Sequence, residues 1–318
     1  MTRKECYDIC FDNKRNLRLS RAAERQAALS RLEEENPRFA EIKRLMSMLG
    51  AKIAVTAISG DKKKLEDMQS TLFTLNSERQ EIIDSAGIEE VGYDCLKCLD
   101  TGYYGGKICD CIKEAATKLY ISELSKTAPV NDCRFENFSL DYYPDTETEG
   151  GNPKKRMTAI FRLCKEYTIG FDPLNSESLL FTGNTGLGKT HLSLAIAYEL
   201  LVQGFNVIYG SAYNLFARME SEHFGEHSDK SYLEAVNCDL LIIDDLGGEF
   251  VSPYIQSLVY NIVNTRLLAR KPTIINTNLS MSEINRIYTP RVASRLLGEY
   301  NAKRFLGSDI RQQKSIEK

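Results

Sequence analysis

At residues 179–191 the chain reads LLFTGNTGLGKTH, an apolar run that enters a glycine-rich loop before the helix-forming segment 192–201. The loop fits the phosphate-binding pattern G-x-x-x-x-G-K-[ST] without a mismatch. Glycines let the backbone turn tightly, so that consecutive N–H groups converge on phosphate oxygens. The positive end of the following helix adds to their field. The stretch therefore predicts a nucleotide site in a strand–loop–helix unit.

The polar residues of this loop have distinct expected roles. We expect Lys189 to reach the β- and γ-phosphates and the Thr190 hydroxyl to bind Mg²⁺. The predicted cofactor-binding residues of the loop are Gly183, Asn184, Thr185, Gly186, Leu187, Gly188, Lys189, Thr190 and His191.

A second apolar run, CDLLIIDDLG at residues 238–247, is typical of a strand buried on both faces of a parallel sheet. A carboxylate at the carboxyl end of such a strand lies where phosphates and metal gather. We expect Asp244 to hold Mg²⁺, mostly through water, and Asp245 to polarise the attacking water. A third strand, Thr273–Thr277, is followed by Asn278, whose amide could orient that water. The alternative for Asn278 is a plain cap before a helix.

Two arginines near the end of the chain, Arg291 and Arg295, are four residues apart and share one helix face. Arginines on a helix are usually solvated. In an oligomeric ATPase, however, one of them could reach the γ-phosphate bound by a neighbouring subunit and stabilise transition-state charge. The sequence does not decide which of the two would do so.

Four cysteines form two close pairs, CLKC at residues 95–98 and CDC at 109–111, separated by a glycine-bearing hairpin. This spacing favours a tetrahedral structural zinc site. The alternatives are a redox pair and four buried thiols, but a redox C-x-x-C is expected to open a helix in a thioredoxin-like unit. A closed four-sulfur site has no open position, so we expect no catalysis by this metal. The predicted ligands are Cys95, Cys98, Cys109 and Cys111.

The first ninety residues predict helices, at 17–35, from Pro37 onward and at 62–86, each with apolar residues spaced by three and four. Such stripes usually mean helix packing within the domain, and a partner-binding face is compatible with it. An aromatic cluster follows in the linker: Phe135, Phe138, Tyr142 and Tyr143. It could pack over an adenine ring or anchor the linker to the nucleotide-binding core. We expect a helical region at 1–90, a zinc knuckle with a linker helix at 91–133, and an ATPase domain at 134–318.

Composition limits the class of protein. The chain has 318 residues, of which 42% are apolar and 27% charged, as in globular proteins. It contains no uninterrupted apolar window long enough for a membrane span, and the charged start lacks the apolar region of a secretory signal. We therefore expect a cytoplasmic protein with reduced thiols and no membrane partner. The net charge of −3 excludes a globally basic nucleic-acid binder but allows a local basic groove.

Together these motifs resemble the AAA+ ATPases of the DnaC/DnaI-type replicative helicase loaders, with the related IstB-like transposition helpers close by. The likeness covers the chain from Phe135 onward, and the first ninety residues match only in general helical character. Four segments carry it: the phosphate loop, 240–247, 277–280 and 291–300.

The resemblance implies an α/β fold, in which a P-loop AAA+ core with a parallel sheet flanked by helices follows a helical N-terminal domain with a small zinc knuckle. It makes Asn278 sensor I, Arg295 the arginine finger and Arg311 sensor II. Two departures matter. Asp245 stands where many AAA+ enzymes have Glu, so slow hydrolysis is expected, and seven residues follow Arg311, which implies an abbreviated lid.

By that resemblance the protein is an ATP-dependent loader of a hexameric replicative helicase onto single-stranded DNA. Its cofactors would be ATP, Mg²⁺ and Zn²⁺, and the AAA+ domain would self-associate. Two alternatives stay open. One is an IstB-like transposition helper that acts on duplex DNA with a transposase, and the other is a non-hydrolysing ATP-dependent adaptor.

Overall fold

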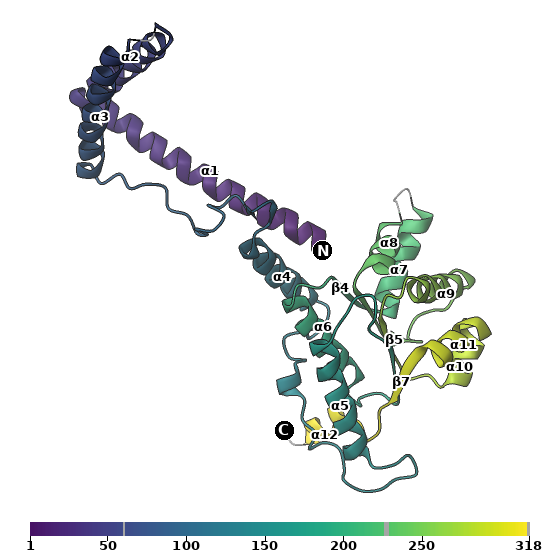
Figure 1. Ribbon diagram of the computed structural model, residues 1–318. Helices are drawn as coiled ribbons and strands as arrows, with labels where there is room; N and C mark the ends of the chain where they lie inside the picture. The colour runs from purple at the N-terminus through teal and green to yellow at the C-terminus, as the bar shows by residue number, and fades with distance from the viewer. Residues whose placement is uncertain (60, 226–228, 317–318) are drawn as a thin grey trace. The chain divides into compact units, whose positions relative to one another are not determined.

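The computed structural model describes residues 1–59, 61–225 and 229–316 (Figure 1). It divides into two compact units. One consists of Met1–Cys6 with Glu114–Lys318, and the other of Tyr7–Lys113. Helix α1 (Arg3–Glu35) and helix α4 (Asp110–Leu124) each belong partly to both units.

The unit Tyr7–Lys113 is mainly helical, as the sequence predicts. Helix α2 (Pro37–Ser59) begins at a proline, whose fixed φ suits the first turn, and the Asn36 side chain accepts a hydrogen bond from the Phe39 amide at 3.0 Å. Helix α3 (Lys62–Ser85) is capped by Asp61. An antiparallel hairpin of β1 (Tyr103–Tyr104) and β2 (Lys107–Ile108) separates the two cysteine pairs. Helix α1 extends further toward the N-terminus than the segment 17–35 expected from sequence.

The second unit contains a five-stranded sheet in which every neighbouring pair is parallel. The prediction of a parallel sheet flanked by helices is therefore confirmed. Sequence reasoning missed the edge strand β7, because its polar sequence YNAKR lacks the apolar run of a central strand. In spatial order the strands are β4 (Val207–Ser211), β5 (Leu240–Leu246), β6 (Thr273–Thr277), β3 (Ser178–Thr182) and β7 (Tyr300–Arg304).

Helices cover both faces of this sheet (Figure 1). The apolar side chains of one face, including Leu241, Ile243 and Ile275, form a buried core with Val259 and Ile262. That face is covered by α7 (Ala212–Phe224), α8 (Lys230–Asn237), α9 (Pro253–Leu268), α10 (Met281–Tyr288) and α11 (Pro290–Glu299). The other face is covered by α5 (Pro153–Ile169) and α6 (Lys189–Val202). The short helices η1 (Phe135–Asn137) and α12 (Ile310–Ile316) complete the unit.

Strand register decides which side chains share the face toward α6. Tyr209 of β4 is level with Ile242 of β5, which is level with Ile274 of β6. Residues in register on parallel strands point to the same face, and residues two apart on one strand do so too. Asp244 and Asn276 each lie two positions further along. Tyr209, Asp244 and Asn276 therefore converge at one end of the sheet.

Candidate nucleotide-binding site and cysteine cluster

The glycine-rich loop connects β3 to α6, whose first residue is Lys189. Lys189 Nζ donates hydrogen bonds to the carbonyl oxygens of Gly183 (2.6 Å) and Asn184 (2.7 Å), at the start of the same loop. Burial lowers the pKa of the Lys189 ammonium, and the nearby charge of Asp244 opposes that shift. The lysine thus lies folded back along the loop.

Three glycines of the loop, Gly183, Gly186 and Gly188, have positive φ and neighbours that a Cβ would approach within 3 Å. Gly188 has φ +89°, and a Cβ there would lie 2.9 Å from both a Phe138 ring carbon and the Tyr143 hydroxyl. Gly186 has φ +74°, and a Cβ would meet the Asp309 carboxylate at 2.0 Å. Both the left-handed backbone and the close neighbours exclude a side chain. Glycine at these positions lets the backbone of the loop approach a phosphate chain closely.

Asp244 is 7% exposed and lies at the centre of a hydrogen-bond network. Its Oδ1 accepts bonds from Thr190 Oγ1 (3.1 Å) and from Asn276 Nδ2 (2.7 Å). The backbone amide of Asp245 donates to the same oxygen at 3.1 Å. The Tyr209 hydroxyl donates to Oδ2 at 2.6 Å. A buried carboxylate needs such donors, because burial without them is costly.

A cavity of about 540 Å³ opens beside this network. Its lining includes Phe138 and Tyr142 of the linker and Arg311 and Lys314 of α12. Such a volume lies within the range of small-ligand and cofactor sites. The lining contains the cationic side chains of Lys189, Arg311 and Lys314. It also contains the Asp244 carboxylate beside the Thr190 hydroxyl. These groups fit a triphosphate with its magnesium ion.

The structure brings most of the predicted residues together around the cavity. The side chains that bond to Asp244 come from different elements, Tyr209 from β4, Asn276 from β6 and Thr190 from α6. Of the described residues, those predicted from sequence that line the cavity are Thr185, Gly186, Leu187, Gly188, Lys189, Thr190, His191, Asp244, Asp245 and Arg311. Gly183 and Asn184 lie at the start of the loop, where they bind the Lys189 ammonium instead.

Asn278 and Arg295 lie outside the set of described residues that line the cavity. Asn278 follows β6 and is exposed. Arg295, on α11, lies against α9: its guanidinium carbon is 4.6 Å from the centre of the Tyr260 ring. The guanidinium donates to Asn264 Oδ1 (2.9 Å) and to the Tyr260 hydroxyl (3.0 Å). The roles predicted for both residues remain predictions.

Among the lining residues that sequence reasoning missed are Tyr209, Asn276 and Lys314. Asn276 has no exposed surface. Its signal in the sequence was a polar residue within an apolar strand, at a position that alternation places on one face of the sheet. Tyr209 had no such signal, because an aromatic residue in a short strand is ordinary. Lys314 lies three residues after Arg311, so the two share one face of α12.

The aromatic cluster fulfils one of the two purposes left open by the sequence, which is to anchor the linker. Tyr143 is buried, and its hydroxyl donates to the Leu187 carbonyl of the loop at 2.9 Å. It therefore anchors the linker to the core. Phe138 and Tyr142, in contrast, line the cavity. His191 accepts or donates a bond at 2.7 Å between its Nε2 and the Arg134 carbonyl, which ties α6 to the same linker.

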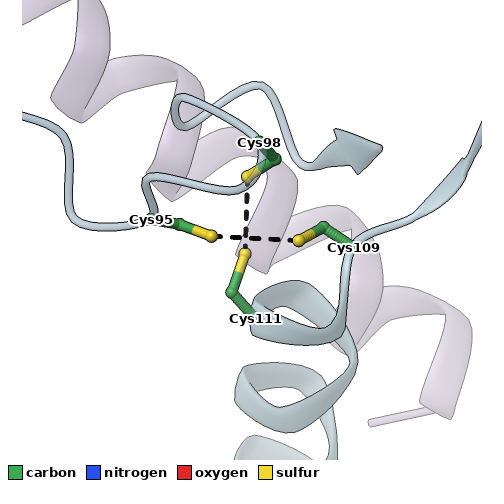
Figure 2. Close-up of side chains that lie close together, drawn as sticks. All are labelled: Cys95, Cys98, Cys109 and Cys111. Atoms are coloured by element: carbon green, nitrogen blue, oxygen red, sulfur yellow. Dashed lines mark hydrogen bonds between the residues drawn. The ribbon is translucent and has the colours of Figure 1, made fainter. Parts of the chain in front are cut away.

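The four predicted cysteine ligands point toward one common centre (Figure 2). Their sulfur atoms all lie within 4.8 Å of one another, with Cys95 and Cys109 at 3.8 Å and Cys98 and Cys111 at 3.6 Å. Four sulfurs bound tetrahedrally to zinc at about 2.3 Å lie roughly 3.8 Å apart. The cluster thus fits a closed Cys₄ zinc site.

Asp100 forms an ion pair that holds the segment connecting the first cysteine pair to the hairpin. Asp100 is 2% exposed and accepts bonds from the amides of Asp94 (2.9 Å) and Cys95 (3.0 Å). Lys14 of α1 donates to the same carboxylate at 2.7 Å, and Arg21 lies 3.6 Å from it. Asp100 therefore fixes the first cysteine pair to α1.

In the part of the chain that the structure describes, no helix is both long and apolar enough to cross a membrane.

Comparison with known proteins relates the chain to ATP-binding proteins. Residues 171–298 match the family described as IstB-like ATP binding protein. The replicative helicase loader DnaC of Escherichia coli (strain K12) is 30% identical over 167 residues, which are 52% of this chain and 63% of that protein. The phage-like element PBSX protein XkdC of Bacillus subtilis (strain 168) is 26% identical over 217 residues, or 61% of this chain and 75% of that protein.

A crystal structure of the DnaC helicase loader aligns with 54% of this chain and 98% of its own, at 22% identity and a TM-score of 0.45. The chain spans less than two thirds of the length of the DnaC relative, at 63%. The resemblance predicted from the motifs is confirmed: residues 171–298 match the IstB-like ATP binding protein family, and the chain is similar to the DnaC-type replicative helicase loaders over about half of its length.

Proposed function

We propose that the protein is an ATP-dependent loader that places a hexameric replicative helicase on single-stranded DNA in the cytoplasm. The observation that carries the proposal is the cavity in which the glycine-rich loop, Asp244 and Arg311 meet, within a region similar to DnaC. ATP binding would favour assembly with the helicase, and hydrolysis would favour release.

The residues around the cavity would have different roles in nucleotide binding. Bound Mg²⁺ would neutralise charge on the phosphates. Lys189, which now donates to two loop carbonyls, has the reach and charge to bind the terminal phosphates. Thr190 and Asp244 are already 3.1 Å apart and would hold the ion, Asp244 mostly through water.

The residues that would act on water and charge lie near the open part of the site. Asp245 is exposed, lines the cavity and has a left-handed backbone, with φ +55°. We assign it the polarising of the attacking water. Arg311 would contact the phosphates from the same subunit, and Asn278 would orient water from the end of β6.

Arg295 would complete the site of a neighbouring subunit, which makes self-association part of the switch. It is held against Tyr260 and Asn264 rather than free in solvent. Arg295→Ala is expected to weaken ATP-dependent assembly in sedimentation, whereas Arg286→Ala, at an exposed position on α10, serves as the control. Assembly that responds to ATP equally in both variants would remove the arginine from the mechanism.

The helical region 1–90 and the zinc knuckle with its linker at 91–133 would supply the helicase-binding part. Among the described residues, α2 and α3 expose large apolar side chains, including Val55, Ile58 and Phe73. Exposed apolar surface of this kind marks interaction sites.

The proposal is tested by measuring helicase binding to the full chain with and without ATP. Lys189→Ala should abolish the response to ATP, whereas Lys155→Ala, at a surface lysine of α5 whose side chain is 76% exposed, should not. Helicase binding by the unmodified chain that is equally strong with and without ATP would contradict the loader hypothesis.

The two alternatives predict different results in the same experiments. The match to IstB-like proteins favours a second candidate, a transposition helper, which would bind duplex DNA and a transposase instead of a helicase. A non-hydrolysing adaptor would show equal, near-zero ATP turnover in the unmodified chain and in Asp245→Ala.

A further inference from the structure

We propose that Tyr209 and Asn276 are positioning residues that fix the Asp244 carboxylate for the divalent cation bound with ATP. The inference rests on the proposed function of the cavity, because it concerns the same carboxylate. It adds two residues from two different strands to a metal site for which the sequence indicated only Thr190 and Asp244.

The geometry defines the orientation of the carboxylate from both sides. Tyr209 of β4 donates to Oδ2 at 2.6 Å, and Asn276 of β6 donates to Oδ1 at 2.7 Å. The two donors reach Asp244 from the strands that flank β5. A carboxylate that is held at each oxygen by a different strand cannot rotate about its Cβ–Cγ bond without breaking one of these bonds.

The direction of each hydrogen bond is determined by chemistry. The phenol of Tyr209 has a proton to donate and a carboxylate oxygen can only accept, so the hydroxyl donates to Asp244. An ionised carboxylate only accepts, so the amide of Asn276 must present its nitrogen to Asp244. The same nitrogen donates to Ser193 Oγ at 2.8 Å, and Ser193 in turn donates to the Thr190 carbonyl.

The amide oxygen of Asn276 gives an independent indication of a ligand. The residue has no exposed surface and lines the cavity, yet its Oδ1 accepts no hydrogen bond from any residue that the structure describes. Buried polar atoms are nearly always paired. An acceptor in this place suits a water molecule that belongs to the coordination shell of a bound cation, since Mg²⁺ usually retains several waters.

These contacts predict a defined defect when they are lost. Partners that orient a metal ligand typically contribute 10- to 100-fold to metal affinity. Tyr209→Phe removes one hydroxyl and keeps the ring, and Asn276→Ala removes the opposite donor. In each case the carboxylate loses one of the contacts that fix its orientation, and the concentration of cation needed for nucleotide binding should rise about 10-fold.

The experiment measures binding of a fluorescent ATP analogue to the full chain while Mg²⁺ is titrated, and binding of Mn²⁺ by electron paramagnetic resonance. Affinity for the analogue in EDTA is measured in parallel, because a general loss of structure would lower it as well. Tyr120→Phe is the matched control: its hydroxyl donates to the Val207 carbonyl of the same strand at 3.2 Å, away from the cavity.

We expect the cation midpoint to rise in Tyr209→Phe and Asn276→Ala, with affinity in EDTA within about twofold of the unmodified chain and Tyr120→Phe unchanged. Equal midpoints in all four proteins, a lower midpoint in the two variants, or a loss that is as large in EDTA would each overturn the inference while leaving the proposed function intact. An unmodified chain that binds no nucleotide with Mg²⁺ would overturn both.

Discussion

Arg266 of α9 has no exposed surface, and all of its hydrogen-bond acceptors are neutral. Its guanidinium donates to the carbonyls of Ala235 (2.7 Å) and Cys238 (3.0 Å), which precede β5. It also donates to the Pro272 carbonyl (2.6 Å) and the Thr273 hydroxyl (2.9 Å), at the start of β6. One side chain thus joins the beginnings of the two strands that carry Asp244 and Asn276 at their other ends.

Replacing Arg266 with Met keeps the length of the side chain and removes every donor. Hydrogen bonds from a charged group contribute about 1.5–3 kcal/mol each, and an acceptor left buried without a partner costs about 1–3 kcal/mol. These terms are not additive, and removing a charge also removes its desolvation cost. We therefore expect Arg266→Met to lower the free energy of unfolding by about 4 kcal/mol, in line with other broken buried polar networks.

The assay is urea unfolding followed by circular dichroism, together with thermal unfolding, where a loss of this size corresponds to roughly 10 °C for a unit of some 200 residues. Arg270→Met, at an exposed position four residues later, is the control and should stay within about 0.5 kcal/mol of the unmodified protein. A loss below about 1 kcal/mol in Arg266→Met would show that the carbonyls find other donors and would refute the reasoning.

Three further outcomes follow from the contacts already described. Gly188→Ala should weaken ATP binding at least about 10-fold and lower stability by about 1–3 kcal/mol, because the new methyl group meets Phe138 and the backbone is left-handed; calorimetry with ATP checks the first effect. The full chain should hold one zinc ion by mass spectrometry, and Cys98→Ser or strong chelation should release it and lower the thermal stability of the unit 7–113; retention of metal by Cys98→Ser would contradict the ligand set. Asp100→Asn should weaken the attachment of the knuckle to α1 by removing the charge facing Lys14, seen as faster hydrogen exchange at the Cys95 amide, and unchanged exchange would argue against it.

The parts of the site that sequence predicted are contiguous in the chain. Residues 183–190 must supply backbone amides to one phosphate chain, so the residue types that this function needs occur at consecutive positions. The cysteine pairs behave in the same way, since each pair spans a single turn and the hairpin between them is short. The apolar run 240–243 predicted a buried parallel strand because both faces of such a strand meet other side chains.

The choice of Arg295 over Arg291 and the sensor role of Asn278 came from the family resemblance. Arg295 and Asn278 lie away from the cavity within one subunit, and no local property of the sequence says how far a side chain on α11 can reach into another subunit. In the same way, the polar residue of β6 that does bond to Asp244 is Asn276, two positions before the one that the pattern selected. Asn276 lies within β6 and is buried, whereas Asn278 follows the strand and is exposed.

The sequence by itself determined that the chain holds a phosphate-binding loop, an acidic strand end and four clustered thiols, since each depends on residues close together along the backbone. Only the tertiary structure decided that Tyr209 and Asn276 bond to the same carboxylate as Thr190. It also decided that Arg266 joins the beginnings of β5 and β6. Those contacts depend on the order β4-β5-β6 and on register, where a shift of one residue would turn each side chain to the opposite face.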